Sequence, residues 1–324
     1  MPELPEVHTT VQGLNEVLGG LSIADVWTGY KSDAHIGKDN IKNPTYFKKF
    51  RMAVIGAKFV SATRRGKNVL INLVKPAARG GEKITVLIHM KMTGHLLYGR
   101  YEFSRSQNIW RTKDTGPLQD PFNQYIRLVF TLVDARGHMS HLAFSDLRKF
   151  AKVFVTPTDT LDHTPDLAHL GPDPLSPDFT LALFKKRLAL RPRGKIKQVL
   201  MEQDVIAGIG NIYSDEILYE AGVHPLSIVE KIPGTKLAKM HAAAKLMLKR
   251  GINFGGDSDS DYRNVYGEPG KFQHMHSVYR RTGKPCPKKV GTGRSSRPCG
   301  GIIERLKIGG RSAHFCPAHQ KLFS

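Results

Sequence analysis

Two adjacent residues at the start of the chain, Pro2 and Glu3, are of types that can perform covalent catalysis. Removal of Met1, which we expect because Pro2 is small, exposes the secondary amine of Pro2 as the α-amino group. An α-amino group titrates near pH ~8 and a lysine near ~10.4, so more of the α-amine is neutral at physiological pH. A neutral amine can attack a sugar carbon and form an iminium, while the Glu3 carboxyl transfers the proton. The alternative is that Pro2-Glu3 only begins a helix.

A second chemical pattern lies near the end of the chain, where all three cysteines fall within a basic segment. We expect one structural Zn²⁺, which needs four ligands, at Cys286, Cys299, Cys316 and His319. Cys316 and His319 have the two-residue spacing of a zinc knuckle, whereas twelve residues separate Cys286 from Cys299. His314 is a competing fourth ligand, and three unligated cysteines are the alternative to a metal site. The odd number of cysteines and the absence of an export signal argue against disulfides.

Two glycines, Gly208 and Gly210, come just before a predicted helix over 212–222. Glycine lets backbone N–H groups approach a ligand closely, and the N-terminus of a helix favours anions. Because Lys195 and Lys197 lie upstream, a DNA phosphate is the ligand that we expect here. A turn between two helices with no ligand is the alternative.

The composition indicates a globular protein with a polyanionic partner. Its 324 residues include 49 Lys and Arg against 28 Asp and Glu, a formal net charge of +21. Twelve basic residues and one acid lie in 271–324, so over half of the charge is concentrated there, and a merely solubilising basic tail is the alternative. A hydrophobic content of 40% argues against disorder, and no segment approaches the ~20 apolar residues of a membrane-spanning helix. The N-terminus does not have the pattern of a signal peptide, so we expect a cytoplasmic, nucleoid-associated protein without a membrane partner.

The spacing of apolar residues predicts the elements that position these groups. Residues 5–18 have helical spacing, and 52–155 contain several short strands separated by turns. Helical spacing returns at 179–190, 196–205, 212–222 and 235–250. Asp178 and Ser214 could cap two of these helices at their start, and Gly222 could end one.

The predicted fold class is therefore α+β with several domains. We expect a helix followed by a catalytic β-sandwich domain over 1–155, and a linker rich in Pro, Asp and Thr over 156–177. A helical DNA-binding domain is expected over 178–270, and a zinc-finger module over 271–324.

Seven blocks of the sequence, in order along nearly the whole chain, resemble the formamidopyrimidine-DNA glycosylase family, to which endonuclease VIII is related. The blocks are PELPEV at 2–7, RRGK at 64–67, HMKMTGHL at 89–96, SDLRKF at 145–150, LGPDPLSPDFT at 170–180, IKQVLMEQ through GIGNIYSDEILYEAGVHP at 196–225, and VYRRTGKPC through FCPAH at 278–319. The resemblance implies a helix–two-turns–helix motif in the helical domain and a β-hairpin zinc finger at the end.

The resemblance also implies roles in catalysis. Pro2 matches the nucleophile and Glu3 the acid–base residue that assists opening of the ribose. Lys67 matches a lysine that acts in β-elimination and contacts phosphate. Arg311 matches a zinc-finger arginine that grips phosphate and assists δ-elimination.

Further residues match DNA-binding positions of the family. Met92, Arg148 and Phe150 match the side chains that fill the void left by an extruded base, although Met92 and Phe150 would otherwise pass as core residues. Lys197 and Asn211 match phosphate-binding positions, and Arg193 is a looser phosphate candidate. Tyr125 stands where the family commonly has a DNA-contacting histidine, and His319 stands where the family has a cysteine ligand.

The resemblance implies a bifunctional glycosylase and AP lyase of base-excision repair. Its PELPEV start and its Met, Arg and Phe set are similar to the branch that removes the oxidised purines 8-oxoguanine and formamidopyrimidine, followed by β,δ-elimination. The expected partner is double-stranded DNA with an oxidised purine or an abasic site, bound by a monomer. The alternatives are an endonuclease VIII-like enzyme for oxidised pyrimidines and a DNA-binding protein that has lost catalysis.

Overall fold

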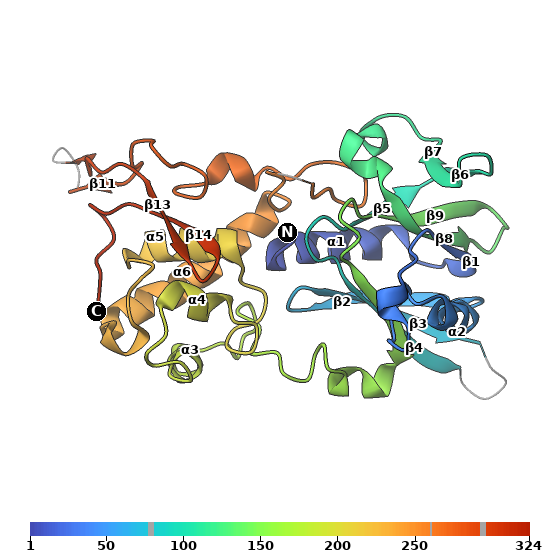
Figure 1. The fold of residues 1–324 in the computed structure, drawn as a ribbon, viewed down its shortest axis with the longest axis horizontal. Helices are drawn as coiled ribbons and strands as arrows, with labels where there is room; N and C mark the ends of the chain where they lie inside the picture. Colours follow the sequence, from blue (N-terminus) through green and yellow to red (C-terminus); the bar gives the residue numbers. More distant parts are fainter. Residues whose placement is uncertain (77–80, 260, 292–295) are drawn as a thin grey trace. The chain divides into compact units, whose positions relative to one another are not determined.

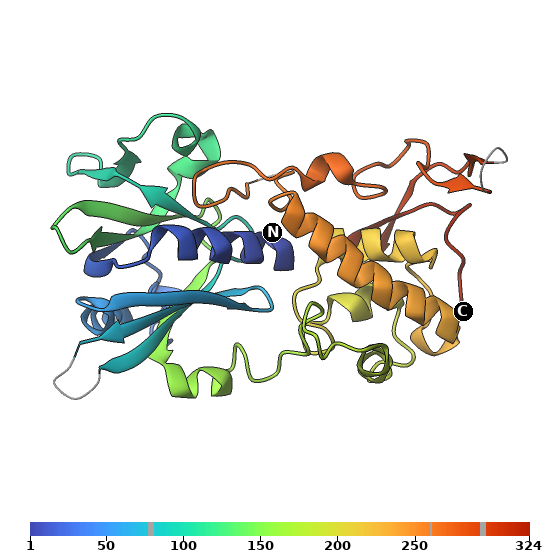
Figure 2. The ribbon, with the colours of Figure 1, turned by 180° about the vertical axis from the view of Figure 1, so that it is seen from behind.

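The computed structural model describes residues 1–76, 81–259, 261–291 and 296–324, which form two compact units. Unit 1 contains 1–168 and 254–271, and unit 2 contains 169–253 and 272–324 (Figures 1 and 2). The expected domain bounds stay a prediction; the two units group the chain differently, with 254–271 in unit 1 and the helical and finger segments together in unit 2. The N–H of Asp257 donates to the Glu6 carboxylate (2.7 Å), and the N–H of Tyr98 donates to the Val265 carbonyl (2.7 Å), which ties this segment to unit 1.

Unit 1 is built on an eight-stranded antiparallel sheet in the order β10-β4-β3-β2-β1-β8-β9-β5. β1 pairs with β2 at Ser22 and Lys58 and with β8 along the rest of its length, so the sheet divides there into the two halves of the predicted β-sandwich. The strands of unit 1 are β1 (Ser22–Thr28), β2 (Lys58–Arg65), β3 (Asn68–Lys75), β4 (Glu82–His89), β5 (His95–Gly99), β6 (Tyr101–Ser104), β7 (Ile109–Thr112), β8 (Ile126–Val133), β9 (Met139–Ser145) and β10 (Lys152–Pro157).

Two α-helices accompany the sandwich: α1 (Leu4–Val17) and α2 (Pro44–Val54). α1 buries Leu4, Val7, Val11 and Leu14, because residues three and four apart share one face of a helix. This confirms the predicted first helix. α2 was missed by the sequence analysis. The short 3₁₀ helices of this unit are η1 (Asp33–His35), η2 (Pro117–Gln119), η3 (Pro121–Gln124) and η4 (Thr158–His163).

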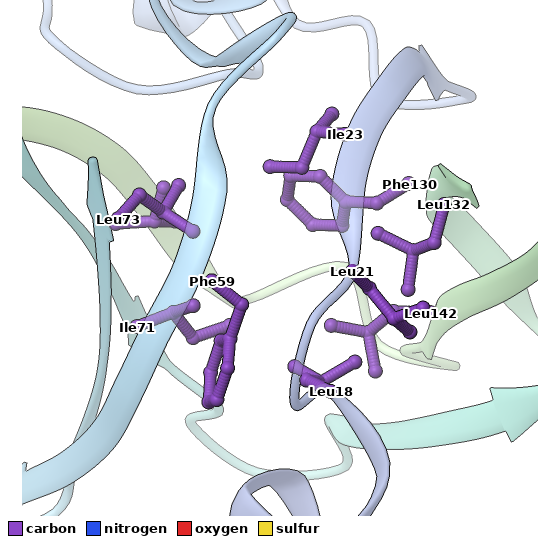
Figure 3. Close-up of a pocket in the computed structure, with 10 residues that line it drawn as sticks. Leu18, Leu21, Ile23, Phe59, Ile71, Leu73, Phe130, Leu132 and Leu142 are labelled. Carbon is purple, nitrogen blue, oxygen red and sulfur yellow. The ribbon is translucent and has the colours of Figure 1, made fainter. Parts of the chain in front are cut away.

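The core of unit 1 lies between the two halves of the sheet. Figure 3 shows side chains from β2 and β3 facing others from β1, β8 and β9 around a small cavity. The cavity has a volume of about 20 Å³, scarcely more than one water molecule needs, and its walls are apolar. It is therefore a packing defect of the core and not a ligand site.

Unit 2 combines helices with short hairpins. Its elements are α3 (Leu181–Leu188), α4 (Ile196–Met201), α5 (Asn211–Ala221), η5 (Val229–Lys231), α6 (Gly234–Asn253), η6 (Phe272–Met275), β11 (Lys289–Val290), β12 (Arg297–Pro298), β13 (Glu304–Ile308) and β14 (Arg311–Phe315). Gly222 ends α5 in the left-handed conformation (φ 65°), as predicted. In the described ranges, no helix is both long and apolar enough to cross a membrane.

The predicted start caps of α3 and α5 were wrong. Thr180, and not Asp178, caps α3 by accepting a hydrogen bond from the N–H of Leu183 (3.2 Å). Gly210 occupies the cap position of α5, and Ser214 lies inside the helix, fully buried. The hydroxyl of Ser214 is used for a tertiary contact, which a propensity argument does not detect.

Candidate active site and nucleic-acid interface

The Pro2-Glu3 pair lies at the start of α1, and both residues are buried. The N–H of Glu3 donates to the Glu6 carboxylate (2.7 Å), so the first turn of α1 fixes the backbone next to Pro2. In Figures 1 and 2 the N-terminus and the turn between β2 and β3 lie at the same end of unit 1. A group held in this way has few conformations to lose on contact with a ligand.

Glu6 is the buried carboxyl group that organises this end of unit 1. Besides the N–H of Glu3, the Glu6 carboxylate accepts the N–H of Asp257 (2.7 Å). The backbone carbonyl of Glu6 accepts the hydroxyls of Thr10 (2.9 Å) and Tyr262 (3.0 Å). Burial, followed by the nearby charges of Glu3 and Asp257, raises the pKa of Glu6 to about 7. Glu6 therefore changes charge near neutral pH.

We expect Glu6→Gln to change how stability depends on pH. A carboxyl whose pKa is raised from 4.5 to about 7 on folding stabilises the fold below pH 4.5, and this contribution is lost as the pH rises through 7. As the pH falls from 7 to 4.5, the free energy of unfolding of the wild type should therefore rise by about 3 kcal/mol relative to that of the variant, at 1.36 kcal/mol per pKa unit. Urea unfolding at a series of pH values measures the difference, and a constant difference across this range would contradict the assignment.

Lys67 lies in the tight turn between β2 and β3, as RRGK predicts, next to Gly66 in the left-handed conformation (φ 57°). Its side chain is only 7% exposed. His89, opposite Asn68 in the sheet, has its pKa lowered to about 3 by burial and then by the charges of Lys91 and Lys67. His89 is therefore neutral, and the field at this end of the sheet is positive, which favours an anion.

The three residues matched to void filling lie on two loops of unit 1. Met92 is half-buried between β4 and β5, and Arg148 and Phe150 follow β9. The Phe150 side chain is 51% exposed, so it is not a core residue, and the Arg148 guanidinium lies 4.7 Å from the centre of its ring. Tyr125 is 37% exposed, and its carbonyl accepts the N–H of Asp146 (2.9 Å).

The glycine turn before α5 is held by Gln203. The side-chain Oε1 of Gln203 accepts the N–H of Gly208 (2.8 Å), and its Nε2 donates to the backbone carbonyls of Met201 (2.7 Å) and Ile209 (2.8 Å). Gly208 has φ 98°, which only glycine adopts readily. Asn211 begins α5, and across the described ranges its buried side-chain oxygen has no hydrogen-bond partner.

Arg193 lies in the loop before α4 and is exposed. It borders a surface hollow of about 350 Å³ together with Arg191 and Lys195. Arg191 is paired with Glu202 (2.8 Å) and Asp204 (2.7 Å), which leaves Arg193 and Lys195 as the cations available to an anion at this hollow. Arg193 was the looser phosphate candidate of the sequence, and Lys195 was named there as a cation upstream of the glycine turn.

Lys197, which matches a phosphate-binding position of the family, lies buried in the structure. Its side chain is 1% exposed, and its Nζ donates to Asp215 Oδ1 (2.6 Å), the Ser214 hydroxyl (3.1 Å) and the Asn211 carbonyl (3.0 Å). A phosphate contact would require these buried bonds to be replaced. Lys197 instead fixes the first turn of α5.

Asp215 links α5 to the hairpin that carries Arg311. Its Oδ2 accepts the backbone N–H of His314 (3.0 Å) and lies 3.0 Å from His314 Nδ1. Gly309 and Gly310 make the turn between β13 and β14, and Arg311 follows at once, opposite Ile308 and exposed. No sequence signal identified Asp215, because a single acid inside a helical pattern usually indicates a solvated face.

The three cysteines lie together in unit 2, with their sulfurs within 4.8 Å of one another. The Sγ atoms of Cys299 and Cys316 are 3.8 Å apart, the separation expected of two thiolates ~2.3 Å from a tetrahedral zinc. Added to Gly301, a Cβ would lie 2.4 Å from Cys316 Sγ, so glycine leaves room for the cluster. This donor set fits a metal ion.

The structure does not bring the expected fourth ligand into this cluster. His319 Nε2 lies 2.9 Å from the carbonyl of Tyr219, and the group of sulfurs does not include either His319 or His314. The alternative ligand His314 is engaged by Asp215. The Tyr219 hydroxyl lies 3.3 Å from Cys286 Sγ, a contact that the sequence did not reveal.

Both units have the architecture of a DNA glycosylase. A family model of the formamidopyrimidine-DNA glycosylase N-terminal domain matches residues 1–153, and one of the formamidopyrimidine-DNA glycosylase H2TH domain matches residues 170–262. The chain belongs to the formamidopyrimidine-DNA glycosylase family, as the sequence blocks predicted, and is therefore a DNA-binding glycosylase of base-excision repair.

Relatives of similar length support this assignment. The formamidopyrimidine-DNA glycosylase of Pelotomaculum thermopropionicum is 33% identical over 99% of this chain and 100% of its own length. That of Rippkaea orientalis is 35% identical over the same shares. A Lactococcus lactis Fpg complexed with DNA containing an abasic site matches with a TM-score of 0.77 and 27% identity, over 98% of this chain and 99% of its own. A complex of the L. lactis enzyme with DNA containing an oxidised pyrimidine matches with a TM-score of 0.75 and 26% identity, over 99% of this chain and 100% of its own.

Proposed function

We propose that this protein removes oxidised purines from double-stranded DNA and then cleaves the strand, acting as a monomer. The observation that carries the proposal is the buried Pro2-Glu3 pair at the start of α1, in a chain of a DNA glycosylase family. The bound DNA of the related L. lactis structures and the exposed Phe150 beside Arg148 support a duplex substrate.

The first step belongs to Pro2. With Met1 removed, its neutral amine attacks C1′ of the damaged nucleotide, the N-glycosidic bond breaks, and the base leaves with its bonding electrons and takes up a proton. The amine nitrogen loses its proton, and Glu3 delivers a proton to the ribose ring oxygen as the ring opens. The product is an iminium between the Pro2 nitrogen and C1′.

Elimination follows from this iminium. Lys67, in the positive field at the β2–β3 turn, assists removal of the C2′ proton, and the 3′ phosphate leaves by β-elimination. δ-Elimination then releases the 5′ phosphate, which Arg311 grips from the tip of its hairpin. Water hydrolyses the remaining iminium and frees Pro2.

Binding uses both units. Met92, Arg148 and Phe150 fill the space left by the extruded base. The carbonyl of Tyr125 bonds the N–H of Asp146, just before the loop of Arg148 and Phe150, and Tyr125 contacts the DNA beside them. Arg193 and Asn211 contact phosphates from unit 2. Zn²⁺ would be held by Cys286, Cys299 and Cys316, where it supplies a structural cross-link to the segment that carries Arg311.

The test is incubation of the protein with four duplexes that contain 8-oxoguanine, formamidopyrimidine, thymine glycol or no lesion. We expect incision at the two oxidised purines, and borohydride should trap a covalent adduct on them. Incision of thymine glycol alone would favour the oxidised-pyrimidine alternative, which the L. lactis complex with an oxidised pyrimidine makes worth including. DNA binding without incision or adduct on any duplex would contradict the proposal.

A further inference from the structure

The loop after β9 is an exposed tetrapeptide held between two buried residues. Leu147, Arg148, Lys149 and Phe150 are all exposed, whereas Asp146 before them and Ala151 after them are buried. We call residues 147–150 the tip loop. A buried acid at the base of the loop costs free energy unless it is hydrogen-bonded, so its bonding partners show how the loop is held.

The carboxylate of Asp146 closes the base of the tip loop. Its Oδ2 accepts the N–H of Ala151 (3.0 Å) and the hydroxyl of Tyr30 (2.7 Å), and its Oδ1 accepts the hydroxyl of Thr93 (2.7 Å). Burial, followed by the charge of Asp146, raises the pKa of Tyr30, so its hydroxyl stays protonated and donates. The buried carboxylate thus receives donors from three separate segments of unit 1.

Thr93 joins the tip loop to the loop of Met92. While its hydroxyl donates to Asp146, the same oxygen accepts the N–H of Arg148 (3.1 Å). Thr93 directly follows Met92, so one side chain connects the two loops that carry the void-filling residues.

A buried cation holds the far end of the tip loop. Lys42 is 6% exposed, and its Nζ donates to the Lys149 carbonyl (2.6 Å) and lies 5.4 Å from the centre of the Tyr30 ring. Lys149 has φ 57°, and so does Lys91 next to Met92. Left-handed backbone is strained for a non-glycine residue and persists where surrounding contacts determine it.

We propose that four buried residues form an anchor cluster that positions the two loops as one rigid wedge for insertion into DNA: Tyr30, Lys42, Thr93 and Asp146. The proposal rests on the proposed function, because it assigns the wedge to Met92, Arg148 and Phe150. A side chain that is held in place before binding loses less entropy on insertion, so the cluster increases the fraction of encounters in which the base is extruded. These four are positioning residues and do not touch the reacting atoms.

The main test compares Thr93→Val, which keeps the shape and removes the hydroxyl, with Thr85→Val. Thr85 is an equally buried threonine of unit 1 whose hydroxyl bonds Asn72 (2.9 Å) and Thr158 (3.0 Å), away from both loops. Insertion is followed by the fluorescence of 2-aminopurine placed opposite an abasic-site analogue. We expect Thr93→Val to reduce the insertion rate and kcat on 8-oxoguanine about tenfold, the effect of losing ~1.4 kcal/mol from its two hydrogen bonds. Thr93→Ser should restore both, and Thr85→Val should leave both unchanged.

A double-mutant cycle separates positioning from general stability. If Thr93 acts through the wedge, adding Thr93→Val to Phe150→Ala should lower kcat far less than Thr93→Val does alone. Fully additive effects of Thr93→Val and Phe150→Ala on kcat would overturn the proposal. So would equal losses in Thr93→Val and Thr85→Val, provided that the wild type is active. Should Thr93→Val not fold by circular dichroism, the same cycle is run with Tyr30→Phe. An inactive wild type would instead count against the proposed function.

Strand cleavage of a single-stranded abasic oligonucleotide completes the test, because no base needs to be extruded or replaced there. We expect the rate of this reaction to change less than twofold in Thr93→Val and in Tyr30→Phe. A tenfold loss on this substrate as well would show that the cluster affects the reacting groups directly and would overturn the wedge assignment.

Discussion

Protein that keeps Met1 or an added N-terminal extension is expected to form no borohydride-trapped adduct with an 8-oxoguanine duplex. In that form the nitrogen of Pro2 is part of a peptide bond, so it has no nucleophilic lone pair. The same protein with Pro2 as its first residue should form the adduct. Mass spectrometry of the starting protein, followed by gel analysis of the trapped complex, measures both forms in parallel.

Two substitutions serve as controls for this result. Pro2→Gly replaces the secondary α-amine with a primary one and loses the ring that orients it, so we expect the adduct to form about 10²-fold more slowly. Glu3→Gln keeps the backbone N–H that bonds Glu6, and the loss of a proton donor should slow opening of the ribose ring, and with it formation of the trapped iminium, by about 10²–10⁴-fold. A trapped adduct from the blocked form would refute Pro2 as the nucleophile.

Cys316→Ser is expected to remove the bound metal and to weaken binding of damaged and undamaged duplexes alike. Its sulfur lies 3.8 Å from that of Cys299, and its loss leaves two of the three clustered thiols. A two-stranded hairpin is marginal by itself, and the apparent binding energy of structural zinc is about 10–16 kcal/mol in finger peptides. We therefore expect at least a tenfold loss of DNA affinity, since Arg311 lies on the hairpin next to this residue.

Metal content by plasma mass spectrometry and DNA binding by fluorescence anisotropy measure the two effects. Ser312→Ala is the matched control, because Ser312 lies on β14, which ends just before Cys316, and the one side-chain bond described for it joins it to the exposed Arg305 (2.9 Å). The control should keep both metal and affinity. If Cys316→Ser retains a full equivalent of metal, the three-cysteine site is wrong.

Much of the fold could be predicted, because its elements have strong periodicity. The helical spacing of Val7, Val11 and Leu14 and the apolar runs of 52–155 identified α1 and the sandwich. α2 was missed although it has a local signal, since Asn43 caps it by accepting the N–H of Thr45 (3.1 Å) and Pro44 opens it. The placement of 254–271 could not be predicted, because it depends on the bond between Glu6 and Asp257, which are far apart in sequence.

The candidate site was predictable where chemistry depends on local pattern. The positions of the three cysteines predicted their clustering, and the glycine of RRGK predicted the turn that carries Lys67. The burial of Lys197 could not be predicted, because a lysine near a glycine turn usually lies on the surface and only the fold supplies its buried partner Asp215. The contacts of Asp146 were equally invisible, because their donors come from segments that the sequence keeps apart.

The way in which the chain connects the two units determines whether proteolysis or grafting can separate them. The chain passes between them at residues 168–169, 253–254 and 271–272. A protease that cuts one of these junctions leaves the units tethered by the other two, and each tether keeps the effective concentration of the partner high. Neither unit is a single contiguous stretch that can be transplanted whole into another chain, so a graft of unit 2 would also have to carry, or replace, the loop that belongs to unit 1.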